Sequence, residues 1–365
     1  MVPEPHASRL ARVRRWLDEA RADAVLVPAS ADFVWLTGAH ARLTERMVAL
    51  ALPRRGDPFC VVGKLEADAL QAACPWLELE AWADGAEPFD ILWRRLGLVR
   101  GPSLFVGEGL RAPALLRLAA HARCRPAADA LGALRAVKDA DEIARLERAA
   151  AHADAIAEEA ADFARPGLRE REMAAFICRR FESVGDREPW AIVATGPNAA
   201  LPHHFTSDRA LEARDVLLLD LGAFTDGYGS DMTRTFWIGD PEPEAERVYD
   251  VVNRARAAGI AAARDGAPAE SVDHAARGVI DGAGYAERFT HRTGHGVGLE
   301  VHEMPYLVAG NRRPLERGMV HSVEPGIYLP GRFGVRLEDL VVVGADGGRR
   351  LNQAPLDPRP PRMRA

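Results

Sequence analysis

The chain has 365 residues, of which 48% are hydrophobic and 27% are charged, and its formal net charge is −6. This length accommodates two domains that each bury a core, in a globular protein of ordinary composition. The negative charge gives no reason to expect nucleic acid or an anionic membrane as a partner, and no run of about 18 apolar residues predicts a membrane span. The cysteines form no CxxC pair, which indicates free thiols in a reducing cytoplasm.

Strand-like and helix-like segments alternate over the first third of the chain. Apolar spacing predicts helices over residues 8–20 and 65–73, and short apolar runs predict strands at 24–29, 33–38, 47–53, 59–63 and 103–107. This order predicts a small α/β domain over residues 1–130. The Pro/Ala/Asp-rich stretch at 125–134 is the expected boundary.

The remaining residues, 131–365, predict an α+β domain. Amphipathic helices are expected over 139–164, 169–184, 243–264 and 269–283, and strand-rich blocks at 190–195, 215–238 and 319–343. Asp139 is the expected N-cap of the first helix. Arg165-Pro166-Gly167 and Arg264-Asp265-Gly266 each precede a helix that ends at a glycine the same distance on, at Gly185 and Gly284. This repeat suggests two similar halves with a site between them.

The segment LLLDLGAFTDGYGSDMTRTF, residues 217–236, carries two aspartates in a predicted hairpin. A turn centred between Thr225 and Asp226 would place Asp220 opposite Asp231. Opposed residues lie about 5 Å apart on one face, and two carboxylates so placed repel unless a proton or a cation lies between them. The alternative is an ordinary turn flanked by solvated aspartates.

Three further segments place ionisable side chains in apolar or glycine-rich surroundings. These segments are FTHRTGHGVGLEVHE (289–303) with His291, His295 and His302, MVHSVEPGIYLP (319–330) with Glu324, and FGVRLEDLVVVG (333–344) with Arg336 and Glu338. Each alone is typical of a core histidine or a solvent-facing glutamate. Together with the two aspartates, they suit a pair of divalent ions such as Mn²⁺, Co²⁺ or Zn²⁺.

The order of these residues resembles metallopeptidase family M24, which has the pita-bread fold. The matching positions are Asp220, Asp231 eleven residues later, His295 in GHGVG, Glu324 in VEPGIY and Glu338 in GVRLED. The sequence is most similar to the proline-specific members, prolidase (Xaa-Pro dipeptidase) and aminopeptidase P. Its first ~130 residues resemble the creatinase-type N-terminal domain, including LTG at 36–38.

The resemblance implies a role for each matching residue. Asp220 would chelate one ion, His295 and Glu324 would bind the other, and Asp231 and Glu338 would bridge them. Glu324 would also transfer the proton, with His203 (in ALPHH, 200–204) and His302 as catalytic histidines on the substrate side. His291 and Arg336 are expected at the substrate, and Thr233 and Arg336 beside the ligands, whereas His204 is expected in a surface loop and Asp339 on the opposite sheet face.

The activity that the resemblance implies is hydrolysis of Xaa-Pro dipeptides by a homodimer. The alternatives are an aminopeptidase P acting on longer peptides, or an M24-fold hydrolase of another bond, such as a phosphotriester or an acylated diamino acid. A dipeptidase needs a cation for the substrate carboxylate. Family prolidases often carry an arginine shortly after the VHE segment, where this chain has Tyr306. We therefore expect ARLTERM (41–47) to supply Arg46 or Arg42, although these are also ordinary loop arginines.

Overall fold

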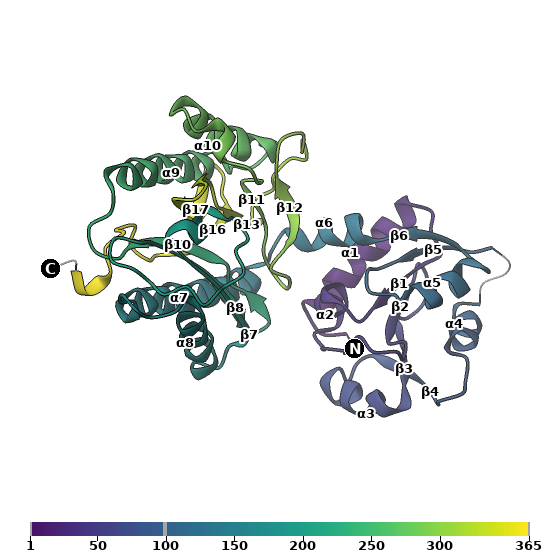
Figure 1. Ribbon diagram of the computed structural model, residues 1–365. Helices are drawn as coiled ribbons and strands as arrows, with labels where there is room; N and C mark the ends of the chain where they lie inside the picture. Colours follow the sequence, from purple (N-terminus) through teal and green to yellow (C-terminus); the bar gives the residue numbers. More distant parts are fainter. Residues whose placement is uncertain (1, 98–100, 364–365) are drawn as a thin grey trace. The chain divides into compact units, whose positions relative to one another are not determined.

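The computed structural model describes residues 2–97 and 101–363 and divides into two compact units, Met1–Arg135 and Ala136–Ala365 (Figure 1). The expected boundary at residues 130/131 lies within helix α6 (Ala128–Ala136), and the two units divide near the end of that helix. Among the described residues, no helix combines the length and the apolar character needed to cross a membrane. The four cysteines are free thiols, as predicted.

The N-terminal unit is built on a mixed six-stranded sheet with the strand order β4-β3-β2-β1-β5-β6. Its strands are β1 (Ala24–Pro28), β2 (Ala49–Pro53), β3 (Phe59–Gly63), β4 (Glu78–Trp82), β5 (Ser103–Val106) and β6 (Arg123–Pro126). Its helices besides α6 are α1 (His6–Glu19), α2 (Ala31–Thr37), α3 (Lys64–Ala73), α4 (Pro88–Leu96) and α5 (Ala112–Ala119). The predicted α/β character of this unit is confirmed.

The strand predicted at residues 33–38 is wrong, because this segment is helix α2. Ser30 caps the helix by accepting a hydrogen bond from the Phe33 N–H, and Gly38 ends it with φ of 76°. The segment reads as a strand because its residues are apolar throughout, and a short buried helix has the same pattern. The cap residues on either side are the signal that separates the two.

Four long helices enclose the strands of the C-terminal unit. They are α7 (Ala140–Phe163), α8 (Glu170–Ser183), α9 (Pro243–Ala262) and α10 (Glu270–Gly282), all close to the predicted ranges. Asp139 caps α7 in a capping box with Glu142. In Figure 1, α7 and α8 lie on one side of the strands and α9 and α10 on the other. Separate apolar clusters join each helix pair to its strands.

The strands of this unit form three sheets within the described residues. The first, β10-β8-β7 with β9 added, comprises β7 (Arg187–Thr195), β8 (Val216–Thr225), β9 (Tyr228–Gly229) and β10 (Met232–Trp237). The second, β12-β11-β13-β16-β17, comprises β11 (Gly294–Gly296), β12 (Glu303–Leu307), β13 (Val320–Val323), β16 (Asp339–Val343) and β17 (Gly348–Arg350). The third pairs β14 (Gly326–Leu329) with β15 (Phe333–Arg336). Short 3-10 helices cover Gly196–Ala200, Ala286–Arg288 and Pro361–Met363. The apolar segment 333–344 therefore contains two strands, β15 and β16, of different sheets.

The predicted repeat corresponds to the same turn in both halves of this unit. Gly167 and Gly266 have φ of 89° and 76°, which glycine adopts without strain. The Gly167 N–H donates to the Leu211 carbonyl and the Gly266 N–H to the Leu315 carbonyl, each at 2.8 Å. In each half, this hydrogen bond thus joins the turn before the helix to a loop of the same half. The strands between the halves carry the ionisable residues.

Candidate metal centre

The β8–β10 hairpin brings the two aspartates to one face, in a register that differs from the prediction. Asp220 pairs with Thr233, not with Asp231. Asp226 and Gly227 have φ of 49° and 84° and form a two-residue turn, so the hairpin is centred one residue later than expected. Asp231 precedes Thr233 by two residues and so lies on the same face, diagonal to Asp220.

Five residues from separate strands and loops converge beside this hairpin. Their potential ligand atoms fall into two groups in which all atoms lie within 4.8 Å of one another: Asp220, Asp231 and Glu338; and His295, Glu324 and Glu338. Glu338, which lies between β15 and β16, belongs to both groups. The two groups are the arrangement expected of two cation positions that share a bridging carboxylate.

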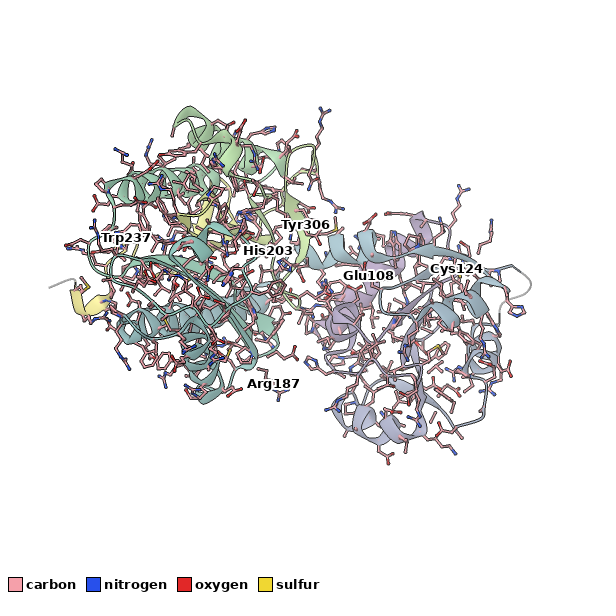
Figure 2. The ribbon with its side chains drawn as sticks, in the orientation of Figure 1. Glu108, Cys124, Arg187, His203, Trp237 and Tyr306 are labelled. Carbon is pink, nitrogen blue, oxygen red and sulfur yellow. The ribbon has the colours of Figure 1, made fainter. Side chains whose placement is uncertain are left out.

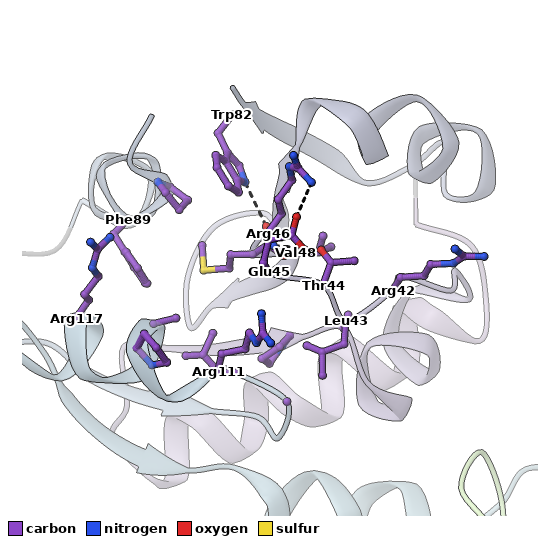
Figure 3. A pocket seen from close by; sticks show the side chains of 18 of the residues that line it. Arg42, Leu43, Thr44, Glu45, Arg46, Val48, Trp82, Phe89, Arg111 and Arg117 are labelled. Atoms are coloured by element: carbon purple, nitrogen blue, oxygen red, sulfur yellow. Dashed lines mark hydrogen bonds and ion pairs between the residues drawn. The ribbon is translucent and has the colours of Figure 1, made fainter. Parts of the chain in front are cut away.

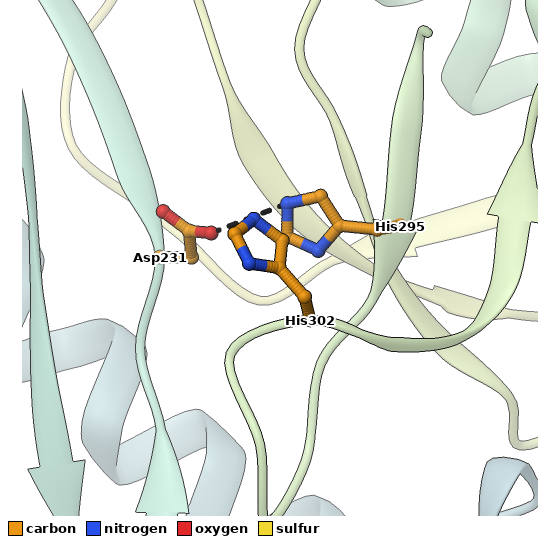
Figure 4. Close-up of side chains that lie close together, drawn as sticks. All are labelled: Asp231, His295 and His302. Atoms are coloured by element: carbon orange, nitrogen blue, oxygen red, sulfur yellow. Dashed lines mark ion pairs between the residues drawn. The ribbon is translucent and has the colours of Figure 1, made fainter. Parts of the chain in front are cut away.

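His295 presents one ring nitrogen to the carboxylates. Its Nε2 lies 3.4 Å from Asp231 Oδ2 (Figure 4). The same nitrogen lies 3.3 Å from Glu324 Oε1. Its Nδ1 lies 3.2 Å from the Gly296 carbonyl oxygen. When a cation is bound, a proton on Nδ1 donated to that carbonyl would leave the Nε2 lone pair to the cation, which is the tautomer that a metal-binding histidine needs. His302 forms a further group with Asp231 and His295, and its ring centroid is 4.1 Å from that of His295.

Buried hydrogen bonds orient the carboxylates. The Thr233 hydroxyl donates to Glu338 Oε2 at 2.7 Å, and Arg336 Nε donates to the same hydroxyl at 3.0 Å. The Arg336 guanidinium also pairs with Asp220. The Ser322 hydroxyl donates to Glu324 Oε1 at 3.3 Å. Metal ligands commonly need such partners to hold their orientation.

The cluster is electrostatically unfavourable without cations. Burial raises the pKa of Asp231 and of Glu338 well above the ordinary range, and the neighbouring carboxylates raise both further. Burial also raises the pKa of Asp220. Glu324 behaves oppositely. Burial is the largest single influence and opposes its ionisation, but the hydrogen bond and charge of His295, together with the charges of His291 and Arg336, lower its pKa to about 2. Three of the four acids thus lack sufficient positive charge nearby.

A pair of divalent ions fits these residues. Asp220 Oδ1 is buried and accepts no hydrogen bond from any described residue. Cations at the two ligand groups would satisfy that oxygen and offset the repulsion among the carboxylates. Carboxylate oxygens with one imidazole nitrogen suit Mn²⁺, Co²⁺ or Zn²⁺ in preference to a structural zinc site, which favours cysteine and histidine.

The five candidate ligands line a cavity of about 700 Å³. Its walls include apolar side chains, among them Trp190, Ile192 and Val301. The polar side chains that line it besides the ligands are those of His203, His291, Arg292, His302 and Arg336. A cavity of this size holds a small peptide.

The histidines expected on the substrate side differ in their surroundings. His203 and His302 are exposed at the cavity. His291 is half-buried, with Nε2 2.8 Å from the Tyr328 hydroxyl and Nδ1 2.8 Å from the Arg292 carbonyl oxygen. His204 is not the free surface residue expected, because its Nε2 lies 2.9 Å from the buried Glu170 carboxylate.

Arg46 belongs to the N-terminal unit, where two acids bind its guanidinium. Its Nε and one terminal nitrogen each lie 3.0 Å from an Asp84 oxygen, and the other terminal nitrogen lies 2.8 Å from Glu45. Arg42 and Arg46 line a cavity of about 540 Å³ in that unit (Figure 3). The role of Arg46 at the substrate stays a prediction.

The sequence reasoning missed three residues that contact the site, Ser322, Tyr328 and Arg292. Ser322 on β13 and Tyr328 on β14 lie on either side of Glu324 in the segment already singled out, and this proximity in sequence was an available signal. Tyr328 contacts both His291 and Arg336. Asp339 points away from the site, as predicted, and pairs with Arg234 at 2.7 Å.

Known proteins match the chain over nearly its whole length. The curated "Probable dipeptidase PepE" of Mycobacterium tuberculosis is 40% identical over 359 residues, 96% of each chain. The crystal structure of dipeptidase PepE from Mycobacterium ulcerans is 39% identical with a TM-score of 0.92, covering 96% of each chain. A prolidase from Thermococcus sibiricus is 33% identical with a TM-score of 0.91, covering 98% of this chain and 99% of the other.

The family descriptions agree with the two units. Residues 9–98 match "Creatinase/Prolidase N-terminal domain", and residues 144–345 match "Metallopeptidase family M24". The second match contains all five residues of the two ligand groups and the strands that carry them. The chain belongs to metallopeptidase family M24.

Proposed function

We propose that this chain is a dipeptidase that hydrolyses Xaa-Pro dipeptides with two divalent ions, Mn²⁺, Co²⁺ or Zn²⁺. The observation that carries the proposal is the pair of buried ligand groups that share Glu338 and line a cavity of about 700 Å³. The names of the similar proteins, dipeptidase and prolidase, support the same class of substrate.

The substrate bond constrains the cavity. The Xaa-Pro bond is a tertiary amide without an N–H, so its binding site needs an apolar wall for the ring and no acceptor for that proton. Trp190, Ile192 and Val301 provide apolar surface beside the ligands. These side chains suit the proline ring.

The protein's own side chains have distinct tasks in the proposed reaction. Divalent ions, when bound, polarise a carbonyl group and lower the pKa of water toward neutrality. Glu324 accepts a proton from the attacking water and returns it to the leaving proline nitrogen. His203 and His302, exposed at the cavity, donate hydrogen bonds to the scissile carbonyl oxygen and to the oxyanion that replaces it. Arg336 and Thr233 keep Asp220 and Glu338 in place.

The test compares chelated protein with protein reloaded with Mn²⁺ or Co²⁺. The substrates are a Xaa-Pro dipeptide, a Xaa-Pro-Xaa tripeptide and a Xaa-Ala dipeptide as control. We expect metal-restored cleavage of the Xaa-Pro dipeptide alone. Cleavage of the tripeptide instead would indicate an aminopeptidase P, and no cleavage of any of the three would indicate a hydrolase of another bond.

Two further expectations concern the protein in the cell. We propose a homodimer, which light scattering on the purified protein would measure. We also propose a cytoplasmic location, which cell fractionation would check.

A further inference from the structure

We propose that the guanidinium of Arg292 binds the C-terminal carboxylate of the dipeptide and thereby restricts the enzyme to dipeptides. This inference rests on the proposed dipeptidase function. A dipeptide whose scissile carbonyl lies at the ligand groups has its carboxylate only about one residue length, ~3.5 Å, further along the chain. The cation that reads this carboxylate must therefore line the same cavity.

The cavity has two arginines in its lining, and one of them is already engaged. Arg336 is 3% exposed and donates to the Thr233 hydroxyl, the Pro202 carbonyl oxygen and the Tyr328 hydroxyl, besides its pairing with Asp220. Withdrawing its guanidinium would leave a ligand carboxylate unsupported. Arg336 is thus unsuited to reading the substrate.

Arg292 has the opposite character. It is half-buried at the cavity, and no carboxylate of the described residues lies within ion-pair distance of it. Its Cζ lies 4.7 Å from the ring centroid of Tyr306, whose side chain is labelled in Figure 2. This is a cation–π contact. The N–H groups lie in the plane of the guanidinium and stay available for a bidentate carboxylate.

The backbone around Arg292 is held in place before any substrate binds. Arg277, on α10, donates to the carbonyl oxygens of Phe289 and His291, each at 2.9 Å. The Thr293 hydroxyl donates to Asp273 at 2.7 Å. The chain is thereby fixed on both sides of an arginine whose own side chain has no acid partner. Preorganisation of this kind reduces the entropy lost on binding.

Arg292 also lies on the substrate side of the cavity. Its side chain lines the same cavity as His302 and the two groups of candidate ligands, so it is in reach of a small peptide bound there. Tyr306 stands where family prolidases often carry an arginine. In this chain, Tyr306 instead supports Arg292, which comes from a neighbouring segment.

The test measures how well the protein distinguishes a carboxylate from an amide. Binding of Gly-Pro and of Gly-Pro amide to the chelated protein is measured by calorimetry, which needs no turnover. The variants are Arg292→Ala and Arg292→Lys. Arg312→Ala is the matched control, because Arg312 is 88% exposed and pairs with Glu270 outside the cavity. Arg46→Ala tests the other candidate.

We expect the wild type and Arg312→Ala to bind the dipeptide about 10- to 100-fold more tightly than its amide, as hydrogen bonds to a charged group imply. Arg292→Ala should abolish this preference without weakening amide binding, and Arg292→Lys should restore part of it. In the metal-loaded protein, Arg292→Ala should raise KM for the dipeptide more than it lowers kcat.

Three results would overturn the proposal: a wild type that does not distinguish the two ligands, an Arg292→Ala variant that weakens both equally, or loss of the preference in Arg46→Ala instead. Failure of the proposed function would give a different result from failure of the role of Arg292. If the loaded wild type cleaves Xaa-Ala but not Xaa-Pro, proline specificity fails, and the same comparison with Gly-Ala and its amide still tests Arg292.

Discussion

The Thr233 hydroxyl links the Glu338 carboxylate to the Arg336 guanidinium. It donates to Glu338 and accepts from Arg336, and Arg336 in turn contacts Asp220. Replacing Thr233 by valine keeps the shape of the side chain but removes both hydrogen bonds. We expect metal affinity or kcat/KM to fall about 10- to 100-fold, the usual loss when a partner of a metal ligand is removed.

Thr235→Val is the matched control for Thr233→Val. Thr235 lies two residues further along β10 and is also buried, but its hydroxyl donates at 2.9 Å to the Arg336 carbonyl oxygen instead of a ligand. Both variants should lose similar thermal stability, whereas metal titration should separate them. Equal metal affinities in the two variants would contradict the role of Thr233.

Asp231 should oppose folding when no metal is bound. Its pKa is raised in the folded state, so the folded protein holds this proton more tightly than the unfolded chain does. The free energy of unfolding of the metal-free wild type therefore falls as the pH rises from about 4 toward the raised pKa. Asp231→Asn removes this contribution.

In EDTA at pH 8 we expect Asp231→Asn to melt at a higher temperature than the wild type, by about 2–4 °C per kcal/mol gained. Its advantage should shrink as the pH falls toward 5. With Mn²⁺ the order should reverse, and activity should fall more than about 100-fold, because the change removes a ligand and not only a supporting group. Calorimetry at several pH values measures this, and an advantage that grows on acidification would contradict it.

At the scale of the element, β11 is a short strand enclosed by two neighbours. It pairs with β12 on one side and with β13 on the other. A Cβ added at Gly294 would lie 2.1 Å from the Ser322 carbonyl oxygen, so the backbone beside His295 would have to move. Gly294→Ala should cost about 1–3 kcal/mol and weaken metal binding by displacing His295.

Gly278→Ala is the control for Gly294→Ala. A Cβ at Gly278, on α10, would meet no atom within 4 Å. Because alanine favours helix over glycine, this variant should gain about 0.5–1 kcal/mol without changing metal affinity. Urea unfolding and metal titration of both proteins test the pair, and a Gly294→Ala protein with unchanged metal affinity would contradict the constraint on β11.

Prediction of the elements from the sequence depended on turn chemistry. The amphipathic helices were predictable because their helical spacing of apolar residues continues over a long segment, and a residue such as Asp139 marks where the helix begins. The hairpin was predicted in kind, but its turn was placed one residue too early, because Asp226-Gly227, and not Thr225-Asp226, occupies the turn. The strand pairing therefore differs from the prediction by two residues. A single residue is enough to change which side chains face one another.

Prediction of the site depended on how close in sequence its contacting residues are. The candidate ligand residues could be singled out from the sequence because carboxylates and a histidine in apolar segments need a partner, and the structure brings them together. Thr233 and Arg336 were also expected beside the ligands and contact Glu338 and Asp220. The contacts of Ser322 with His295 and of Tyr306 with Arg292 were not predicted, because they form only after β11 pairs with β12 and β13. Such pairing joins segments far apart in sequence, and local patterns do not encode it.

At the scale of the whole molecule, the C-terminal unit places its two similar halves around one set of strands. Its separate apolar clusters attach α7 and α8 to one set of strands and α9 and α10 to another. The candidate ligand residues come from segments on both sides of this arrangement, with Asp220 in β8 of the first sheet, Asp231 between β9 and β10, and His295 in β11 of the second sheet. Metal binding should therefore join the halves.

This arrangement predicts that metal stabilises the unit as a whole. Mn²⁺ in 100-fold excess over its dissociation constant should add about 2.7 kcal/mol to the free energy of unfolding. Hydrogen exchange should slow in β8 and β11 together on addition of Mn²⁺. Protection confined to one of these strands would contradict the role of the site in joining the halves.

The central claim is that Asp220, Asp231, His295, Glu324 and Glu338 hold two adjacent divalent ions. The most direct measurement is the anomalous scattering of a crystal grown with Mn²⁺. We predict two peaks, one between Asp220, Asp231 and Glu338 and the other between His295, Glu324 and Glu338. A single peak, or manganese bound away from these five residues, would contradict the account.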